Sequence, residues 1–97
     1  MIVGVATAEL HIPQARSLKD KRRVVKSLLD QIANRHHVSA AEVEHHDLHQ
    51  RSQLGFALVN SDRGRAAATL EAIHRAVAER HEAYLTEWQA DLIEDFG

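Results

Sequence analysis

Residues 2–12 alternate in character from one position to the next, and this period of two predicts a β-strand. One face of the strand carries only small or aliphatic residues: Ile2, Gly4, Ala6, Ala8, Leu10 and Ile12. The other face is mixed and carries Val3, Val5, Thr7, Glu9 and His11. Pro13 ends the strand because it has no backbone N–H to donate to a sheet.

The pattern then changes to a helical period. Ser17 is a favourable N-cap residue, and Asp20 follows in the first turn, where the helix dipole favours an acid. The apolar residues that come next fall on one side of a helix at 100° per residue. They are Leu18, Val25, Leu28, Leu29 and Ile32. These features predict a helix over about 18–35.

Two more strands are predicted in the middle of the chain. The first covers about 38–46, has a weaker strand propensity, and carries Glu42 and Glu44. A polar connection leads to the second, over 53–60, which alternates strictly. Its larger apolar residues share one face and are Leu54, Phe56 and Leu58.

The last third of the chain predicts a helix and a final strand. Ser61 or Asp62 is expected to cap a helix over roughly 63–80. Its apolar stripe, with a spacing of four, three and four residues, is Ala66, Leu70, Ile73 and Val77. The final strand is predicted over 84–92, and period-two alternation places three of its residues on one face: Tyr84, Thr86 and Trp88.

The order β-α-β-β-α-β is that of the ferredoxin-like, split βαβ fold. Right-handed crossovers place both helices on one face of a four-stranded antiparallel sheet. We therefore predict a single α+β domain over residues 1–97. The core beneath the helices is expected to contain Ala6, Ala8, Leu10, Leu54, Phe56 and Leu58.

Several segments of the chain together form a recognisable pattern: Ile2-Val-Gly-Val, residues 9–13, residues 17–29, Val43-Glu and Leu54-Gly. In these segments the chain resembles the YlxP-like family of small bacterial proteins. The stretch Ser17-Leu-Lys-Asp-Lys-Arg-Arg is the most specific of them. The resemblance covers nearly the whole chain and implies a ferredoxin-like fold, a bacterial cytoplasmic protein, and a setting in translation or ribosome maturation. It carries over no known activity.

Composition narrows the possible functions. With 12 basic and 14 acidic residues the formal net charge is −2, which is not the overall balance of a general nucleic-acid binder. The chain has no cysteine, so disulfides, thiolate catalysis and thiolate metal sites are excluded. No apolar run is long enough for a membrane span, and no basic stretch precedes the first strand. We therefore expect a cytoplasmic protein with no membrane partner.

A stripe of cations is predicted on the first helix. Its members fall within an arc of about 100° that faces solvent: Lys19, Arg22, Arg23 and Lys26. Arginine forks onto phosphate or carboxylate, and lysine supplies a point charge. The stripe is a candidate contact for RNA or an acidic protein. The alternative is an ordinary solvated helix face, stabilised by a pair between Lys26 and Asp30 four residues on.

Lys21 lies at a different angle, on the apolar side of the same helix. We expect its stem to cover the end of the sheet while its ammonium group reaches solvent. In that position it could line a small pocket, so it is grouped with the candidate partner-binding residues.

A histidine and acid cluster occupies the connection between the second and third strands. It consists of Glu44, His45, His46, Asp47 and His49, with Arg51 beyond. Imidazoles and a carboxylate are zinc ligands, so the region 45–49 is a candidate for a metal-assisted hydrolase. Adjacent strand residues point to opposite faces, however, and the same objection applies to His36 and His37. A polar hairpin is the alternative.

Glu9 and His11 share the mixed face of the first strand and are a candidate acid–base pair. No nucleophile accompanies them, because cysteine is absent and Ser17 is used as a cap. Cross-strand polar pairing is the alternative interpretation.

The sheet face away from the helices is predicted to be small and apolar. Its candidate dimer-interface residues are Val3, Val5, Thr7, Ala57 and Val59. A bare apolar face favours an interface, and a homodimer would relieve the limited burial of a small domain. RNA-binding sheets of this topology stack bases on exposed aromatics, and this face lacks them.

Together these features predict a non-enzymatic, dimeric binding module that contacts RNA, a ribosomal particle or an acidic protein, with no cofactor. A metal-assisted hydrolase using His45–His49 is the alternative. Eight histidines can move the formal charge from −2 towards +6 on full protonation, so binding to an anionic partner is expected to strengthen between pH 8 and pH 6.

Overall fold

The structure, a computed structural model, describes residues 1–95. Its elements are β1 (Ile2–His11), α1 (Leu18–His36), β2 (Ser39–Glu44), β3 (Arg51–Asn60), α2 (Arg63–Ala78) and β4 (Tyr84–Ile93). This is the predicted order. Neither helix combines the length and apolar composition of a membrane span within these residues.

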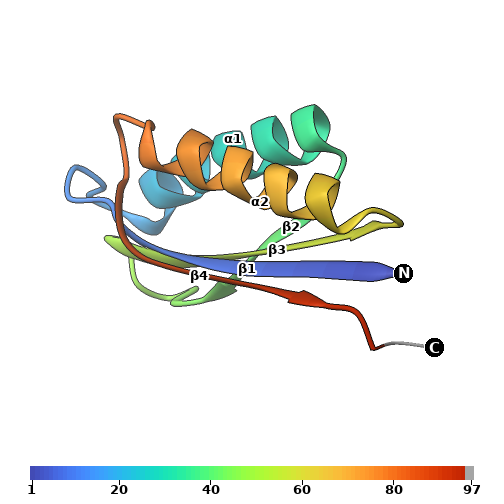
Figure 1. Cartoon of the computed structure of the whole chain (residues 1–97). Coiled ribbons are helices and arrows are strands. Elements are labelled where there is room, and N and C mark those ends of the chain that lie inside the picture. Colours follow the sequence, from blue (N-terminus) through green and yellow to red (C-terminus); the bar gives the residue numbers. More distant parts are fainter. Residues whose placement is uncertain (96–97) are drawn as a thin grey trace.

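The four strands form one antiparallel sheet in the order β2-β3-β1-β4. Both helices lie on one face of this sheet, and the other face carries no layer (Figure 1). The predicted ferredoxin-like fold is confirmed.

Capping side chains begin the helices where the sequence predicts. The Ser17 hydroxyl accepts a hydrogen bond from the backbone N–H of Asp20 at 3.1 Å. The Asp20 carboxylate in turn accepts from the backbone N–H of Arg16 at 3.0 Å, a variant of the capping box in which the donor lies one residue before the N-cap. Asp62, one of the two predicted candidates, caps α2 by accepting from the Gly64 N–H at 2.8 Å.

The core lies between the sheet and the helices. Phe56 is 3% exposed and Leu54 is fully buried beneath the helix layer. The predicted core residues of β1 and β3 are all buried: Ala6, Ala8, Leu10, Leu54, Phe56 and Leu58. The predicted orientation of both strands is therefore confirmed.

Three element boundaries differ from prediction by two residues. The strand β2 ends at Glu44 because His45 adopts a left-handed conformation, with φ of 66°, that leaves the sheet. The strand β3 begins two residues earlier than predicted, at Arg51, because β1 extends far enough for His11 to pair with it. The helix α2 ends at Ala78 rather than near residue 80.

The predicted face of β4 is wrong for part of the strand. Glu9 pairs with Glu87 and Leu10 pairs with Leu85, so one extra β4 residue is accommodated in a bulge. The bulge reverses the alternation and turns Trp88 towards the helices. There its ring stacks on His74, with centroids 4.6 Å apart. Tyr84, before the bulge, is 60% exposed instead.

Candidate functional site

The cationic stripe lies on the solvent-facing side of α1, in the N-terminal half of the helix. Its four residues, Lys19, Arg22, Arg23 and Lys26, are all exposed. Seven residues separate the first from the last, which corresponds to about 10 Å along the helix axis. The Ser17 cap fixes where the helix begins, so it also fixes the direction in which the stripe points. The structure therefore brings these four predicted residues together on one surface.

Most of the stripe has no partner within the protein. Lys26 forms the predicted pair with Asp30, at 2.8 Å between Nζ and Oδ2. The hydrogen bond that Lys26 donates to Asp30, together with the negative charge of Asp30, raises the pKa of Lys26. Among residues 1–95, Lys19, Arg22 and Arg23 form no ion pair. Their charges remain available to an external anion.

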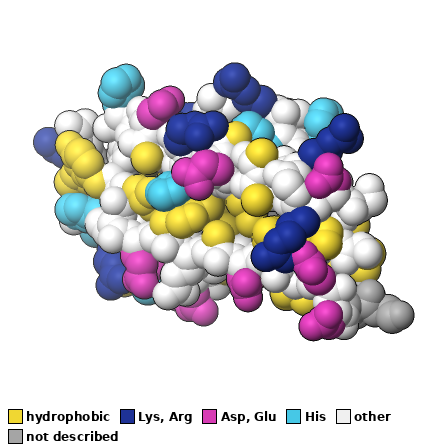
Figure 2. All heavy atoms as spheres, in the orientation of Figure 1, with side chains coloured by type: hydrophobic (Ala, Val, Ile, Leu, Met, Phe, Trp, Pro, Cys, Tyr) yellow, Lys and Arg dark blue, Asp and Glu magenta, His cyan; other side chains and the backbone are white. Residues whose placement is uncertain are grey.

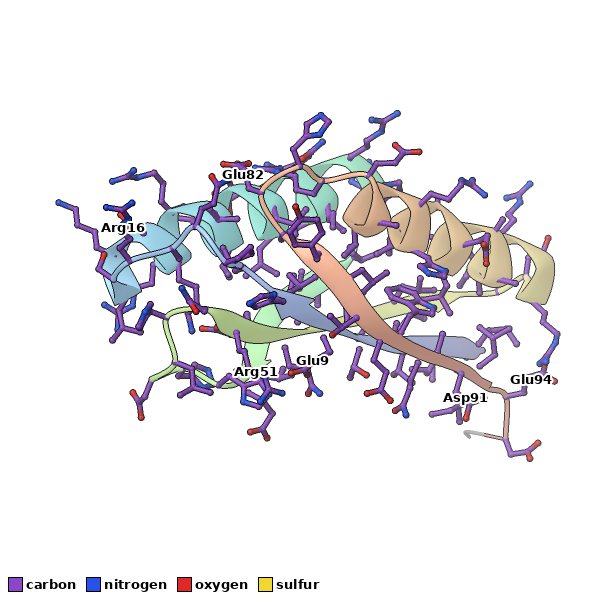
Figure 3. The ribbon with its side chains drawn as sticks, turned by 90° about the vertical axis from the view of Figure 1, so that its left-hand side faces the viewer. Glu9, Arg16, Arg51, Glu82, Asp91 and Glu94 are labelled. Atoms are coloured by element: carbon purple, nitrogen blue, oxygen red, sulfur yellow. The ribbon has the colours of Figure 1, made fainter. Side chains whose placement is uncertain are left out.

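Figure 2 shows basic and acidic side chains mixed over the helix layer, with several more acidic side chains along the lower side of the same view. Asp91 and Glu94 lie along β4 and just after it, whereas Arg16 lies at the start of α1 on the helix side (Figure 3). The locally basic surface of α1 is therefore defined by the four residues of the stripe and not by the helix layer as a whole.

Lys21 does not belong to this surface. It is fully buried, and its Nζ donates to the carbonyl oxygens of His45, Arg51 and His46 at 2.7, 3.2 and 3.3 Å. Its Nζ also lies 3.0 Å from Oε2 of Glu42. The expectation of a solvent-exposed ammonium was wrong, because these four acceptors gather beneath the helix. Lys21 is a structural cation that cannot contact a partner in this conformation.

The outer sheet face brings together the predicted dimer-interface residues. Val3 pairs with Val59 and Val5 pairs with Ala57, while Thr7 pairs with Gly55. Val59 is 66% exposed, so the end of this face nearest the start of β1 presents open apolar surface on β3, while Asp91 of β4 pairs with Val5 and places a carboxylate beside it.

Two apolar residues on the same face were missed from the sequence. Val43 of β2 covers Gly55, where an added Cβ would lie 2.9 Å from Cγ1 of Val43. Ile93 of β4 pairs with Val3. Val43 is 42% exposed and Ile93 is 44% exposed. Val43 and Ile93 lie on β2 and β4, the two edge strands of the sheet. Their place on this face depends on the register of all four strands, which the pattern of a single strand does not give.

The opposite end of the outer face is polar and centred on Glu9. Its Oε1 lies 2.7 Å from a guanidinium nitrogen of Arg51 and 2.8 Å from Nε2 of His45, and its Oε2 accepts from Gln53 at 3.2 Å. Figure 3 shows Glu9 and Arg51 together on the side of the sheet away from the helices. The predicted partner of Glu9 was His11, and the structure corrects this to His45 and Arg51.

The electrostatics of Glu9 follow from these contacts. Burial raises the pKa of its carboxyl group. The hydrogen bond from Arg51, the charge of His45 and the hydrogen bond from Gln53 together lower this pKa by more than burial raises it. The net pKa lies below the ordinary value, so Glu9 is an anion at neutral pH. A carboxylate saturated in this way holds β1, β3 and the β2–β3 connection together.

The histidine-rich connection does not form a ligand cluster in the part of the chain that the structure describes. No three histidine or acidic side chains there gather closely enough to hold a metal ion. His45 turns to Glu9, whereas Nε2 of His46 lies 3.1 Å from the carbonyl oxygen of Glu42. The metal-assisted alternative therefore gains no geometric support.

Comparisons with known proteins identify relatives and a shared fold. A family model described as "Protein of unknown function (DUF503)" matches residues 3–90. The uncharacterized protein YlxP of Bacillus subtilis (strain 168) is 36% identical over 72 residues, which cover 74% of this chain and 78% of that protein. A de novo designed protein with a ferredoxin fold, solved by solution NMR, has a TM-score of 0.55 and 12% identity. That match covers 100% of this chain and 88% of the designed one, and it shows the fold alone.

Proposed function

The chain belongs to the DUF503 family of proteins of unknown function, and from its surface geometry we propose that it is a non-enzymatic, cytoplasmic, dimeric module that binds RNA. Family membership agrees with the resemblance to YlxP-like proteins. The RNA contact is the exposed stripe of α1, and the second copy binds at the outer sheet face.

One observation carries the RNA proposal. Lys19, Arg22 and Arg23 lie on one solvent-facing side of α1 and have no ion-pair partner within residues 1–95. Cations without an internal partner bind a phosphate backbone without first breaking an ion pair. Their binding releases the counterions condensed on that backbone. Two neighbouring guanidinium groups also match the fork geometry that phosphate oxygens accept.

RNA fits this surface better than an acidic protein segment does. A phosphate backbone presents a continuous row of anions, which matches a row of cations about 10 Å long. The contact is made by the helix and not by the sheet, because the aromatic residues that stack bases in sheet-binding domains are scarce on the outer face. Tyr84 stands alone at one end of that face among the described residues. The family resemblance implies a ribosomal particle as the physiological source of the RNA.

The outer sheet face supports the dimer. It exposes Val59 and Ile93 at its apolar end and Val43 beside Gly55, on three different strands, and both helices lie on the opposite side of the sheet (Figure 1). A second copy supplies an identical apolar face, which is how isologous interfaces form. Because the helices lie on the opposite side of each sheet, a sheet-to-sheet dimer leaves both α1 stripes open to solvent. Dimerisation and RNA binding are therefore separable.

The RNA proposal is tested by fluorescence anisotropy with a labelled single-stranded RNA. Reversing the charges of Arg22 and Arg23 to Glu is expected to weaken binding by about tenfold or more, because two phosphate contacts become repulsive. The matched control reverses Arg63 and Arg65 to Glu at the start of α2, which changes the net charge equally. Equal losses in both double variants, or no RNA binding by the unmodified protein, would contradict the proposal. An acidic peptide that binds where RNA does not would favour a protein partner.

The dimer is tested by sedimentation velocity at tens of micromolar protein. The variant with Val5→Glu and Ala57→Glu is expected to sediment as a monomer, because charge on an apolar interface loses its solvation there. Ala68→Glu, on the exposed side of α2, is the control and is expected to remain dimeric. A monomeric unmodified protein would contradict this part of the proposal.

A further inference from the structure

A groove runs between the surfaces of α1 and α2, on the side of the molecule away from the sheet. It encloses about 180 Å³. Its floor is apolar and small, made by the buried Ile32 and by Ala72 and Ala76, which lie four residues apart on α2. Because the two alanines present no bulk, the polar side chains above them border an open space.

Two of those side chains are arginines from opposite walls of the groove, Arg35 on α1 and Arg75 on α2. Both are exposed, and within the described chain neither side chain forms an ion pair or a hydrogen bond. Arg80 shows the contrast. Its guanidinium donates to Gln31 Oε1 at 2.7 Å and to Ser27 Oγ at 2.8 Å, and it pairs with Glu82 at 3.1 Å.

No other charged group at the groove forms an ion pair with these arginines within the described chain. Glu79 lies four residues after Arg75, a spacing suited to a helical ion pair, yet the two do not approach within 4 Å. The carbonyl ends of α1 and α2 both lie at the groove and add partial negative charges. The attraction for an anion therefore rests on the two guanidinium groups, and not on the net charge of the groove.

The pKa of His36 responds to the charges around the groove. Its ring lines the groove and is half-buried. Burial lowers its pKa, and the positive charges of Arg35 and His37 lower it further. An anion placed between the arginines would oppose that effect and raise the pKa of His36.

We propose that the groove binds a single phosphate group, gripped from its two walls by the guanidinium groups of Arg35 and Arg75. The groove provides about 180 Å³, which is room for one tetrahedral oxyanion with water around it. It is smaller than the roughly 300 Å³ at which pockets for larger ligands begin. The phosphate belongs either to a small phosphorylated compound or to a nucleic acid. The proposal does not depend on the stripe of α1, because it uses different residues.

The test is a titration of the intact protein with inorganic phosphate, followed by amide and histidine NMR signals at constant ionic strength. Saturable shifts are expected at groove residues, with chloride at the same ionic strength as the reference. Arg35→Gln and Arg75→Gln are each expected to weaken binding by about tenfold, since each removes a charge-assisted contact. Glu79→Gln is expected to strengthen it. Arg63→Gln, whose side chain pairs with Glu94 away from the groove, is the control and is expected to have no effect.

A second arm identifies the source of the phosphate. Saturation by inorganic phosphate, with a rise in the pKa of His36, supports a small phosphorylated ligand. Groove shifts that appear only with single-stranded RNA, and that vanish in the Arg35→Gln and Arg75→Gln variants, support a nucleic-acid phosphate. Shifts that never saturate with either probe, or that are unchanged in both arginine variants, would overturn the proposal.

Discussion

The two sides of α1 use the same kind of side chain for opposite purposes. Lys21, on the inner side, is fully buried, and its ammonium group has three backbone carbonyls and a carboxylate around it. Lys19 and Arg22, on either side of it in sequence, are exposed and unpaired within residues 1–95. The helical phase decides which role each cation takes: an inner one holds the fold and an outer one is left for a partner.

The inner cation stabilises the fold through more than its charge. Glu42, which faces Lys21, also accepts a hydrogen bond of 2.6 Å from the buried Ser52 hydroxyl. In the described part of the chain no buried side-chain polar atom lacks a partner, so this network is fully satisfied. It ties the start of α1 to β2, to β3 and to the connection between them.

Removing the inner cation is the largest effect we predict. Lys21→Met is expected to destabilise the domain by about 3–5 kcal/mol, because it leaves Glu42 and the carbonyls around it uncompensated. Urea denaturation measures this loss. The double variant that adds Glu42→Leu is expected to be more stable than Lys21→Met alone, since it removes the unpaired carboxylate. A loss below about 1 kcal/mol for the single variant would show that the cluster is not a structural anchor.

The same contrast between an inner and an outer side holds for β3. Phe56→Ala, beneath the helices, is expected to cost about 3–5 kcal/mol through lost burial and a cavity. Val59→Ala, on the open face, is expected to cost less than about 1 kcal/mol in the monomer. Urea denaturation of both variants at low protein concentration makes the comparison. A loss under about 1 kcal/mol for Phe56→Ala would mean that the strand faces are inverted.

Much of this arrangement follows from sequence periodicity. The alternation in β1 and β3 and the caps Ser17 and Asp62 are local signals, and the structure confirms them. The sequence also places Lys21 on the apolar side of α1. It does not predict that Lys21 is buried, because the acceptors are main-chain carbonyls more than twenty residues away. Local patterns cannot report a partner of that kind.

Two further features depend on the pairing between strands. The bulge opposite Glu9 changes the face of Trp88, and nothing within β4 itself marks the extra residue. His45 reaches Glu9 because of its left-handed backbone, which no local preference for glycine or asparagine announces. Periodicity therefore locates the stripe on one helix and the outer-face residues of β1 and β3, but it misses the features that depend on the register between strands.

A smaller effect concerns pH. RNA binding is expected to strengthen by about two- to fivefold between pH 8 and pH 6, because exposed histidines gain positive charge as the pH falls. His46 and His49 are exposed histidines of the β2–β3 connection, whose main chain binds Lys21 of α1. His36 contributes less, because its lowered pKa keeps it neutral to more acidic pH.

Anisotropy titrations at constant ionic strength test this prediction. The double variant His46→Gln and His49→Gln is expected to lose most of the increase, whereas His81→Gln, outside that connection, is expected to retain it. A flat profile for the unmodified protein would show that the histidines lie away from the bound RNA.

The salt dependence of RNA binding tests the central claim most directly. For a single strand, the logarithm of the binding constant falls with the logarithm of salt concentration by about 0.7 for each phosphate contact. Contacts from Lys19, Arg22, Arg23 and Lys26 predict a slope of about −2 to −3, reduced in magnitude by about 1.4 when Arg22 and Arg23 are both changed to Gln. The corresponding change of Arg63 and Arg65 to Gln is expected to leave the slope unaltered. A slope near zero, or one that the Arg22 and Arg23 changes do not alter, would contradict the assignment of RNA binding to the outer side of α1.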